Sequence, residues 1–130
     1  MSLENKHILV IDDTASIRTF LRISLEGQGA HFMEAETAQE GLDLCEKTKP
    51  DLVVLDLGLP DRDGLDILPE LRERSLDGQD TPIIVLTVRK DLLVMDSALR
   101  RGASAYMTKP FMMEELLEVI NEKITMRHRM

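Results

Sequence analysis

Carboxylates follow two apolar runs of this 130-residue chain at the points where the runs end. Asp12 and Asp13 follow the run 7–11, and Asp56 follows the run 52–55. Two unit charges about 4 Å apart repel by about 4 kcal/mol at an effective dielectric of about 20, so three gathered carboxylates need compensation. Oxygen ligands without histidine or cysteine at useful spacing favour a hard cation. A few loop carboxylates suit Mg²⁺ with retained waters better than a full Ca²⁺ cage.

A hydroxyl and an ammonium follow two further apolar runs, as Thr87 and Lys109. A divalent ion beside a carboxylate, with a hydroxyl and an ammonium nearby, makes a site for a phosphoryl group. The ion and the lysine neutralise its oxygens, the hydroxyl donates a hydrogen bond, and the carboxylate can attack phosphorus. We therefore expect Asp56 to become phosphorylated with Mg²⁺ as cofactor. In the alternative interpretation, Asp12, Asp13 and Asp56 are helix caps or turn acids, which would not also require the lysine and the hydroxyl.

Five short runs rich in Ile, Val and Leu predict the strands that position these groups. The runs cover residues 7–11, 31–35, 52–55, 83–86 and 105–108. The third and fourth are apolar throughout, which is typical of central strands in a parallel sheet that is covered on both faces. Ligands bind such sheets beyond the carboxyl ends of the strands, where the strand order reverses. If the first and third strands are neighbours, the carboxylates meet at one edge.

Five segments of helical periodicity alternate with the strands. The expected inward residues are Ile17, Phe20, Leu21 and Leu25 in the first, Leu92, Met95 and Leu99 in the fourth, and Leu117, Ile120 and Ile124 in the fifth. A capping box over 37–40 opens the second helix. The third is expected over 64–75 with a late or distorted start, because Pro69 removes a helical hydrogen bond. This alternation predicts an α/β fold with right-handed crossovers and helices on both faces of the sheet.

Length, charge and cysteine content narrow the class of protein. The chain has the size of one compact domain, and we expect a single domain over residues 1–130. A net charge of −8 argues against direct binding of nucleic acid. No apolar run approaches the roughly 20 residues of a membrane helix, and the start lacks the apolar segment of a signal peptide, so we expect a cytoplasmic protein without membrane contact. Cys45 has Ala38 and Leu42 at helical spacing, which indicates core packing rather than a reactive thiol.

Taken together, the motifs resemble the receiver domain of two-component response regulators across essentially the whole chain. They are Ile11-Asp12-Asp13, Leu55-Asp56 with Leu59-Pro60 and Asp63-Gly64, Thr87, Gly102-Ala103, and Tyr106 with Lys109-Pro110-Phe111. The stretch LDLGLPDRDG is most similar to receivers of the OmpR/KdpE type. The resemblance implies a CheY-like, flavodoxin-like (βα)5 fold whose five parallel strands are ordered 2-1-3-4-5.

The resemblance also implies a phosphoacceptor site. Asp56 would take a phosphoryl group from the phosphohistidine of a sensor histidine kinase or of a phosphotransfer protein. Asp12 or Asp13, Asp56 and the backbone carbonyl of Gly58 would hold Mg²⁺. The domain would be a signalling module with weak self-phosphorylation and autodephosphorylation, not a metabolic enzyme.

A switch is implied in the same way. Lys109 would pair with the phosphoryl oxygens, with a cis bond to Pro110. Thr87 would move toward the new group and Tyr106 would turn inward behind it. The surface of the fourth helix, fifth strand and fifth helix would then change for a downstream effector or output domain, and a phosphorylation-dependent dimer is a further implication.

Several positions depart from the family pattern. Val88 stands where a small residue is usual after Thr87, and its bulk is expected to crowd the phosphoryl site. Gly58 and Arg89 occupy positions that tune dephosphorylation in relatives. Ser104-Ala105 replace acids that form interface ion pairs in OmpR-like receivers, which weakens the case for a dimer, and Met112-Met113 replace a frequent aspartate cap.

Other functions remain as alternatives. A receiver that acts as a binding scaffold without phosphorylation is favoured by Val88 alone. A phosphatase of the haloacid dehalogenase type expects a second acid two residues after the nucleophile, where Gly58 stands, and a flavin-binding protein expects a phosphate loop rich in Ser and Thr after the first strand. At single positions, Tyr106 could be ordinary packing, Thr87 a strand-end hydroxyl without a switching role, and Lys109 a solvated lysine.

Overall fold

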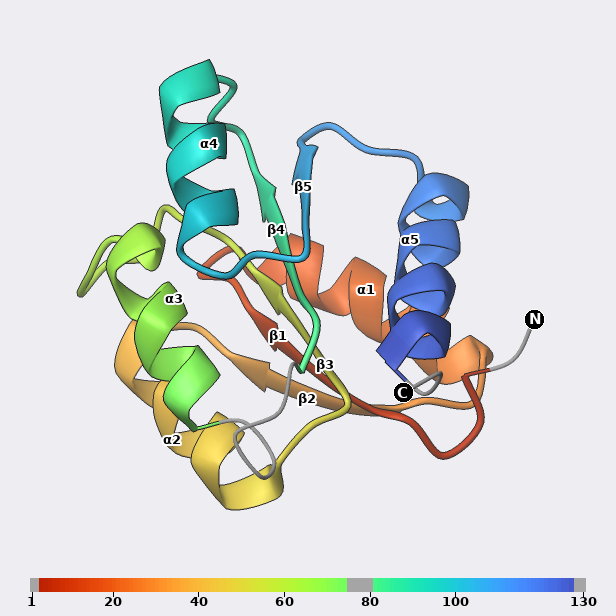
Figure 1. Cartoon of the computed structure of the whole chain (residues 1–130). Coiled ribbons are helices and arrows are strands. Elements are labelled where there is room, and N and C mark those ends of the chain that lie inside the picture. Colours follow the sequence, from red (N-terminus) through yellow and green to blue (C-terminus); the bar gives the residue numbers. More distant parts are fainter. Residues whose placement is uncertain (1–2, 75–80, 128–130) are drawn as a thin grey trace.

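The computed structural model describes residues 3–74 and 81–127, in which strands and helices alternate along the chain (Figure 1). The strands are β1 (His7–Ile11), β2 (His31–Ala35), β3 (Leu52–Leu55), β4 (Ile83–Thr87) and β5 (Ala105–Thr108). The helices are α1 (Ala15–Gly27), α2 (Ala38–Thr48), α3 (Gly64–Glu73), α4 (Leu92–Arg100) and α5 (Met113–Arg127). Within these described residues, no helix combines the length and the apolar character needed to cross a membrane.

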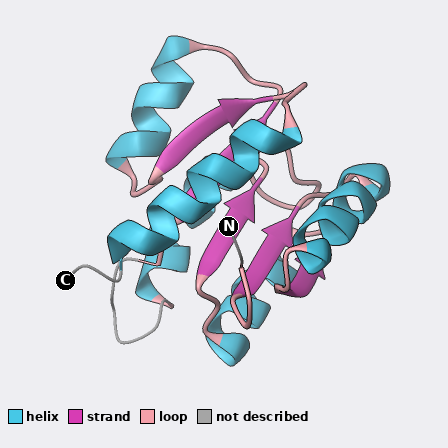
Figure 2. Ribbon diagram, turned by 90° about the vertical axis from the view of Figure 1, so that its right-hand side faces the viewer, coloured by secondary structure: helices cyan, strands magenta, loops and turns pink. Residues whose placement is uncertain are grey.

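All five strands form one parallel sheet in the order β2-β1-β3-β4-β5, which confirms the predicted fold class. Figure 2 shows the strand arrows pointing the same way between two helical layers. The central strands β3 and β4 are buried along their whole length, as their apolar sequences predict. Ile11 of β1 lies beside Leu55 of β3 in the register. The residues that follow them, Asp12 and Asp56, therefore leave the sheet at the same edge.

Helices cover the sheet on both faces and create two apolar cores. Helices α2, α3 and α4 pack on one face, and α1 and α5 on the other (Figure 1). Alternate residues of each strand supply the two cores, as with Leu9 on the first face and Val10 on the second. Cys45 is buried in the first core, as expected, and burial raises the pKa of its thiol. This places it among packing residues, not reactive ones.

Helix α3 does not start late. It begins at Gly64, where the Asp63 carboxylate caps it by accepting the Leu65 amide at 2.9 Å. It then passes through Pro69 and ends at Glu73; the predicted end at Ser75 lies outside the described residues. Pro69 has no N–H to donate to the Leu65 carbonyl four residues before it. The guanidinium of Arg101, the residue after α4, donates to that carbonyl instead, at 3.1 Å. It replaces the backbone hydrogen bond that Pro69 cannot make.

The inward face of α4 differs from the prediction. Leu92 is 76% exposed and Leu99 is 47% exposed, while Ala98 is buried and Val94 packs on the core. Of the three residues predicted to face inward, Leu92 and Leu99 are therefore exposed and Met95 is half-buried.

The buried residues of α1 and α5 also differ in part from those predicted. Phe20, predicted to face inward in α1, is 48% exposed, and the centre of its ring lies 6.1 Å from that of Phe111. In α5, Leu116 is fully buried and Leu117 only partly, whereas Ile120 and Ile124 are buried as predicted.

The contact between Arg101 and the Leu65 carbonyl predicts a coupling with Pro69. Arg101→Ala should lower the free energy of unfolding by about 0.5–1.5 kcal/mol, the usual contribution of such a bond. The cost should shrink in a Pro69→Ala background, because an alanine N–H can supply the missing donor. Urea denaturation of the two single variants and the double variant measures this difference; equal costs in both backgrounds would contradict the assignment.

Candidate functional site

Three carboxylates gather at the carboxyl edge of the sheet. One oxygen of each of Asp12, Asp13 and Asp56 lies within 4.8 Å of the others. Asp12 and Asp56 are buried, at 2% and 8% exposure, whereas Asp13 is exposed. They come from the β1–α1 and β3–α3 connections, which the strand register brings together: the Asp56 amide donates to the Ile11 carbonyl at 2.9 Å. The structure thus brings together the three acids that the sequence singles out.

Lys109 joins this cluster from the end of β5. Its Nζ lies 2.7 Å from Asp12 Oδ2 and 3.1 Å from Asp56 Oδ2. Burial by itself would lower the pKa of Lys109, but the hydrogen bond and charge of Asp12, with those of Asp56, outweigh it and raise the pKa. The side chain therefore stays an ammonium. The Lys109–Pro110 peptide bond is cis.

Charge and donor chemistry at the cluster fit a divalent cation. Three carboxylates against one ammonium leave two negative charges in a partly buried site, where repulsion is weakly screened. The carboxylate donors are hard oxygens, and the exposed Asp13 leaves one side open to water, as Mg²⁺ prefers. Gly58 lies two residues after Asp56, and its amide donates to Asp56 Oδ1 at 3.2 Å. The residues present therefore fit a magnesium ion.

Both buried acids are also turn acids. Asp12 Oδ1 accepts the Thr14 amide at 2.9 Å, as Asp56 Oδ1 accepts that of Gly58. In each carboxylate, the backbone orients one oxygen and Lys109 contacts the other. Each of these side chains is therefore a turn acid through one oxygen and a member of the charged cluster through the other.

Gly64 allows the first turn of α3 to pack against the Asp56 connection. Its amide donates to the Leu57 carbonyl at 2.8 Å. A Cβ at position 64 would lie 2.6 Å from Leu57 Cα and 2.8 Å from the Asp56 carbonyl oxygen, closer than such atoms come. Gly58, by contrast, has open space around its Cα. Close backbone approach therefore requires glycine at 64 and not at 58.

Thr87 and Tyr106 each contact the backbone of Arg89, in the β4–α4 connection. Thr87 is buried, its carbonyl accepts the Lys109 amide at 2.8 Å, and its Oγ1 lies 3.5 Å from the Arg89 amide. The Tyr106 hydroxyl donates to the Arg89 carbonyl at 2.8 Å. Burial raises the pKa of the Tyr106 phenol, so it stays a donor. Val88 is 67% exposed, so little of its side chain contacts the rest of the described protein.

Arg89 also links the two connections that flank the site. Its Nη1 lies 3.2 Å from both carboxylate oxygens of Asp63, the residue that caps α3. Both side chains are partly exposed, so this ion pair is screened by solvent. It joins the β4–α4 connection to the β3–α3 connection across the surface.

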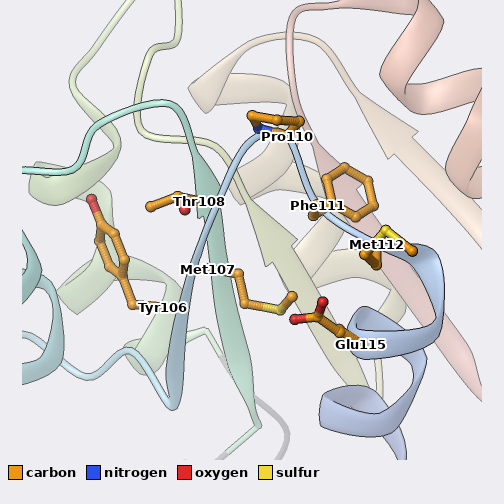
Figure 3. Close-up of a pocket in the computed structure, with 7 residues that line it drawn as sticks. All are labelled: Tyr106, Met107, Thr108, Pro110, Phe111, Met112 and Glu115. Carbon is orange, nitrogen blue, oxygen red and sulfur yellow. The ribbon is translucent and has the colours of Figure 1, made fainter.

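A hollow of about 320 Å³ lies beside the site, between β5 and the start of α5. In Figure 3, Tyr106 and Thr108 extend to one side of β5, and Met107 to the other, toward Glu115. Pro110, Phe111 and Met112 of the β5–α5 connection complete its wall. Tyr106 therefore borders this hollow while its hydroxyl reaches Arg89.

The sequence did not reveal that Asp61 caps α2. Its two carboxylate oxygens accept the amides of Ala38 and Gln39, at 2.8 and 3.0 Å, and the bond from Ala38 does most to lower the pKa of Asp61. The predicted capping box is present as well, since Thr37 Oγ1 accepts the Glu40 amide. Asp61 lies more than 20 residues from these partners, and no local pattern could have indicated the pairing.

Comparison with known proteins agrees with this geometry. Residues 8–121 match the model of the response regulator receiver domain family. The chain is 44% identical over 110 residues to the KDP operon transcriptional regulatory protein KdpE of Escherichia coli, a match that covers 85% of this chain and 47% of that protein. The chain spans about half the length of the curated relatives it matches.

Solved structures show the same likeness. A CheY-like receiver domain protein from Methanospirillum hungatei superposes with a TM-score of 0.90 at 31% identity, over 97% of this chain and 98% of that one. The receiver domain of the sensor histidine kinase PA1611 from Pseudomonas aeruginosa, described with a magnesium ion coordinated in its active site cleft, superposes with a TM-score of 0.83 at 25% identity. That match covers 93% of this chain and 98% of the other.

The close approach at Gly64 predicts a pair of contrasting substitutions. Gly64→Ala should lower the free energy of unfolding by about 1–3 kcal/mol, because its methyl group overlaps the Leu57 and Asp56 backbone. Gly58→Ala is the matched control, since its methyl group meets open space, and it should change stability little. Urea denaturation compares the two; similar costs would show that the approach at Gly64 is not limiting.

Proposed function

The chain belongs to the response regulator receiver domain family, and from this membership we propose that Asp56 is the phosphoacceptor through which it relays a signal. The observation that carries the proposal is the cluster of Asp12, Asp13 and Asp56 with Lys109 between two of the acids. In the proposed reaction, a carboxylate oxygen of Asp56 attacks the phosphorus of a phosphohistidine. The new P–O bond replaces the P–N bond, and imidazole leaves.

Asp12, Asp13, Asp56 and the Gly58 carbonyl are the proposed magnesium ligands. The ion, when bound, would neutralise charge on the phosphoryl oxygens. Support comes from the two uncompensated negative charges of the cluster and from the magnesium described in the similar PA1611 domain. In the absence of a phosphoryl group, Lys109 offsets part of the repulsion between Asp12 and Asp56.

Transfer to Asp56 adds negative charge beside Lys109 and Thr87, and these are the proposed sensors. Lys109 can exchange a carboxylate partner for a phosphoryl oxygen, and the buried Thr87 hydroxyl can donate to another. Because Thr87 Oγ1 neighbours the Arg89 amide and Tyr106 holds the Arg89 carbonyl, a shift of Thr87 moves this connection. Arg89 and Gly58 are the proposed tuners of phosphoryl lifetime.

The proposed output is the α4-β5-α5 surface. Exposed apolar side chains stand near and on α4, at Val88, Leu92, Leu93 and Leu99. A sensor histidine kinase or phosphotransfer protein is the proposed donor, and an effector or output domain the proposed target. Curated relatives about twice as long as this chain agree with an output domain. The proposal includes a cytoplasmic location and one receiver domain over residues 1–130. It includes no enzymatic activity beyond weak self-phosphorylation and autodephosphorylation.

A small phosphodonor with Mg²⁺ tests the phosphoacceptor. The intact mass of the wild-type protein should rise by one phosphoryl group, and Asp56→Asn should abolish the gain. Asp61→Asn is the control, because Asp61 lies in the same connection but caps α2. An unchanged wild-type mass would favour a binding scaffold that works without phosphorylation.

Loss of Lys109 should separate cation binding from switching. Lys109→Ala removes the counter-charge of Asp12 and Asp56, so Mg²⁺ affinity should not fall. The response to phosphorylation should be lost. Tyr106 is the only tyrosine and there is no tryptophan, so intrinsic fluorescence reports on it directly. The wild-type signal should change with phosphodonor and Mg²⁺ and that of the variant should not; a full response in the variant would refute this role of Lys109.

A further inference from the structure

Arg18 reaches from α1 back to the connection that carries the first two acids. Its Nη1 donates to the Asp12 carbonyl at 2.8 Å. Its Nε donates to Glu34 Oε1 at 2.7 Å, and its Nη2 lies 3.6 Å from Glu36 Oε2. Only 13% of the side chain is exposed. A guanidinium buried to this extent and held at three points has little freedom to move.

The carbonyl that Arg18 holds belongs to the peptide group between Asp12 and Asp13. On the strand side, the Asp12 amide donates to the Ala35 carbonyl of β2 at 3.0 Å, so the sheet orients it. On the Asp13 side, the bond from Arg18 orients the peptide plane. The exposed Asp13 carboxylate pairs with none of the residues described in 3–74 and 81–127. Its direction therefore depends on the backbone that Arg18 holds.

We propose that Arg18 is a positioning residue for the cation site: by holding the Asp12–Asp13 peptide, it aims the Asp13 carboxylate at the other two. The inference rests on the proposed function, because it takes the three acids as magnesium ligands. Arg18 does not touch the ion in this role. It acts through the backbone, as groups behind metal ligands commonly do.

The direction in which Mg²⁺ affinity changes distinguishes a positioning role of Arg18 from a simple effect of its charge. Arg18 is a cation near a cation site, so the loss of its charge alone would strengthen Mg²⁺ binding. The loss of its hold on the peptide would weaken it, because the Asp13 carboxylate would have to be ordered on binding. Arg18→Lys keeps the charge, but one ammonium cannot reproduce the planar fork that spans the carbonyl and Glu34. Weaker binding in this variant therefore has no electrostatic explanation.

Arg22 provides a matched control one turn further along α1. It also pairs with Glu34, and its guanidinium lies 5.4 Å from the centre of the Phe32 ring. Its side chain is more exposed than that of Arg18. Arg22→Gln therefore removes the same charge and one pairing with the same glutamate, but leaves the Asp12 carbonyl bonded.

Calorimetric titration with MgCl₂ at fixed pH and ionic strength is the test. Arg18→Lys and Arg18→Gln should each weaken binding by about tenfold, the lower end of what loss of a group behind a metal ligand costs. Arg22→Gln should bind as well as wild type or slightly better. Unchanged or tighter binding in both Arg18 variants would overturn the proposal. If wild type itself bound no Mg²⁺, the proposed function would fail, a result distinct from equal affinities.

A second measurement does not depend on the metal. In the metal-free protein, exchange of the Thr14 amide, which donates to Asp12 Oδ1, should be faster in Arg18→Lys than in wild type and unchanged in Arg22→Gln. Thermal unfolding checks that each variant still folds. If Arg18→Gln does not fold, Arg18→Lys still tests the proposal, because its ammonium can pair with Glu34. Identical exchange of the Thr14 amide in wild type and Arg18→Lys would contradict the positioning role.

Discussion

Repulsion among three carboxylates is the constraint on which the rest of this structure depends. Asp12 and Asp56 are nearly buried, Asp13 is beside them, and Lys109 is the cation that bonds to two of the three. Such a cluster is costly to assemble, because like charges are weakly screened where water is scarce. The fold offsets the cost with the Lys109 ammonium and with backbone amides from Thr14 and Gly58. The negative charge that remains is what a divalent cation would neutralise.

The sheet and its connections hold this arrangement in place. The buried strands β1 and β3 fix the ends from which the acids project, and the half-buried edge strand β5 carries the lysine. Around them, side chains bond to backbone groups of other segments: Asp61 to the start of α2, Arg101 to α3, and Arg18 of α1 to the Asp12 carbonyl. The Asp61 contact joins two connections, the Arg101 contact joins the end of α4 to α3, and the Arg18 contact joins α1 to the β1–α1 connection.

The sequence was sufficient for the strands, the fold class and the gathering of Asp12, Asp13, Asp56 and Lys109. Buried parallel strands leave continuous apolar runs, and a parallel sheet must bring their carboxyl ends to one edge. The bonds of Arg18, Asp61 and Arg101 to the backbone could not be predicted, because a side chain that bonds to a distant backbone group leaves no periodic pattern. On α4, apolar spacing indicated Leu92 and Leu99 as inward, yet both are exposed. Periodicity reports that a helix has an apolar face, and it does not tell what covers that face.

The two contacts of Lys109 join residues that are 97 and 53 positions apart in the chain. During synthesis the acids emerge from the ribosome first, and the lysine emerges only after most of the domain has been translated. A growing chain that has formed β1 and β3 therefore carries its carboxylates without their protein counter-charge. The counter-charge arrives only when β5 has joined the sheet, so the charges at this edge are complete only when the last strand is in place.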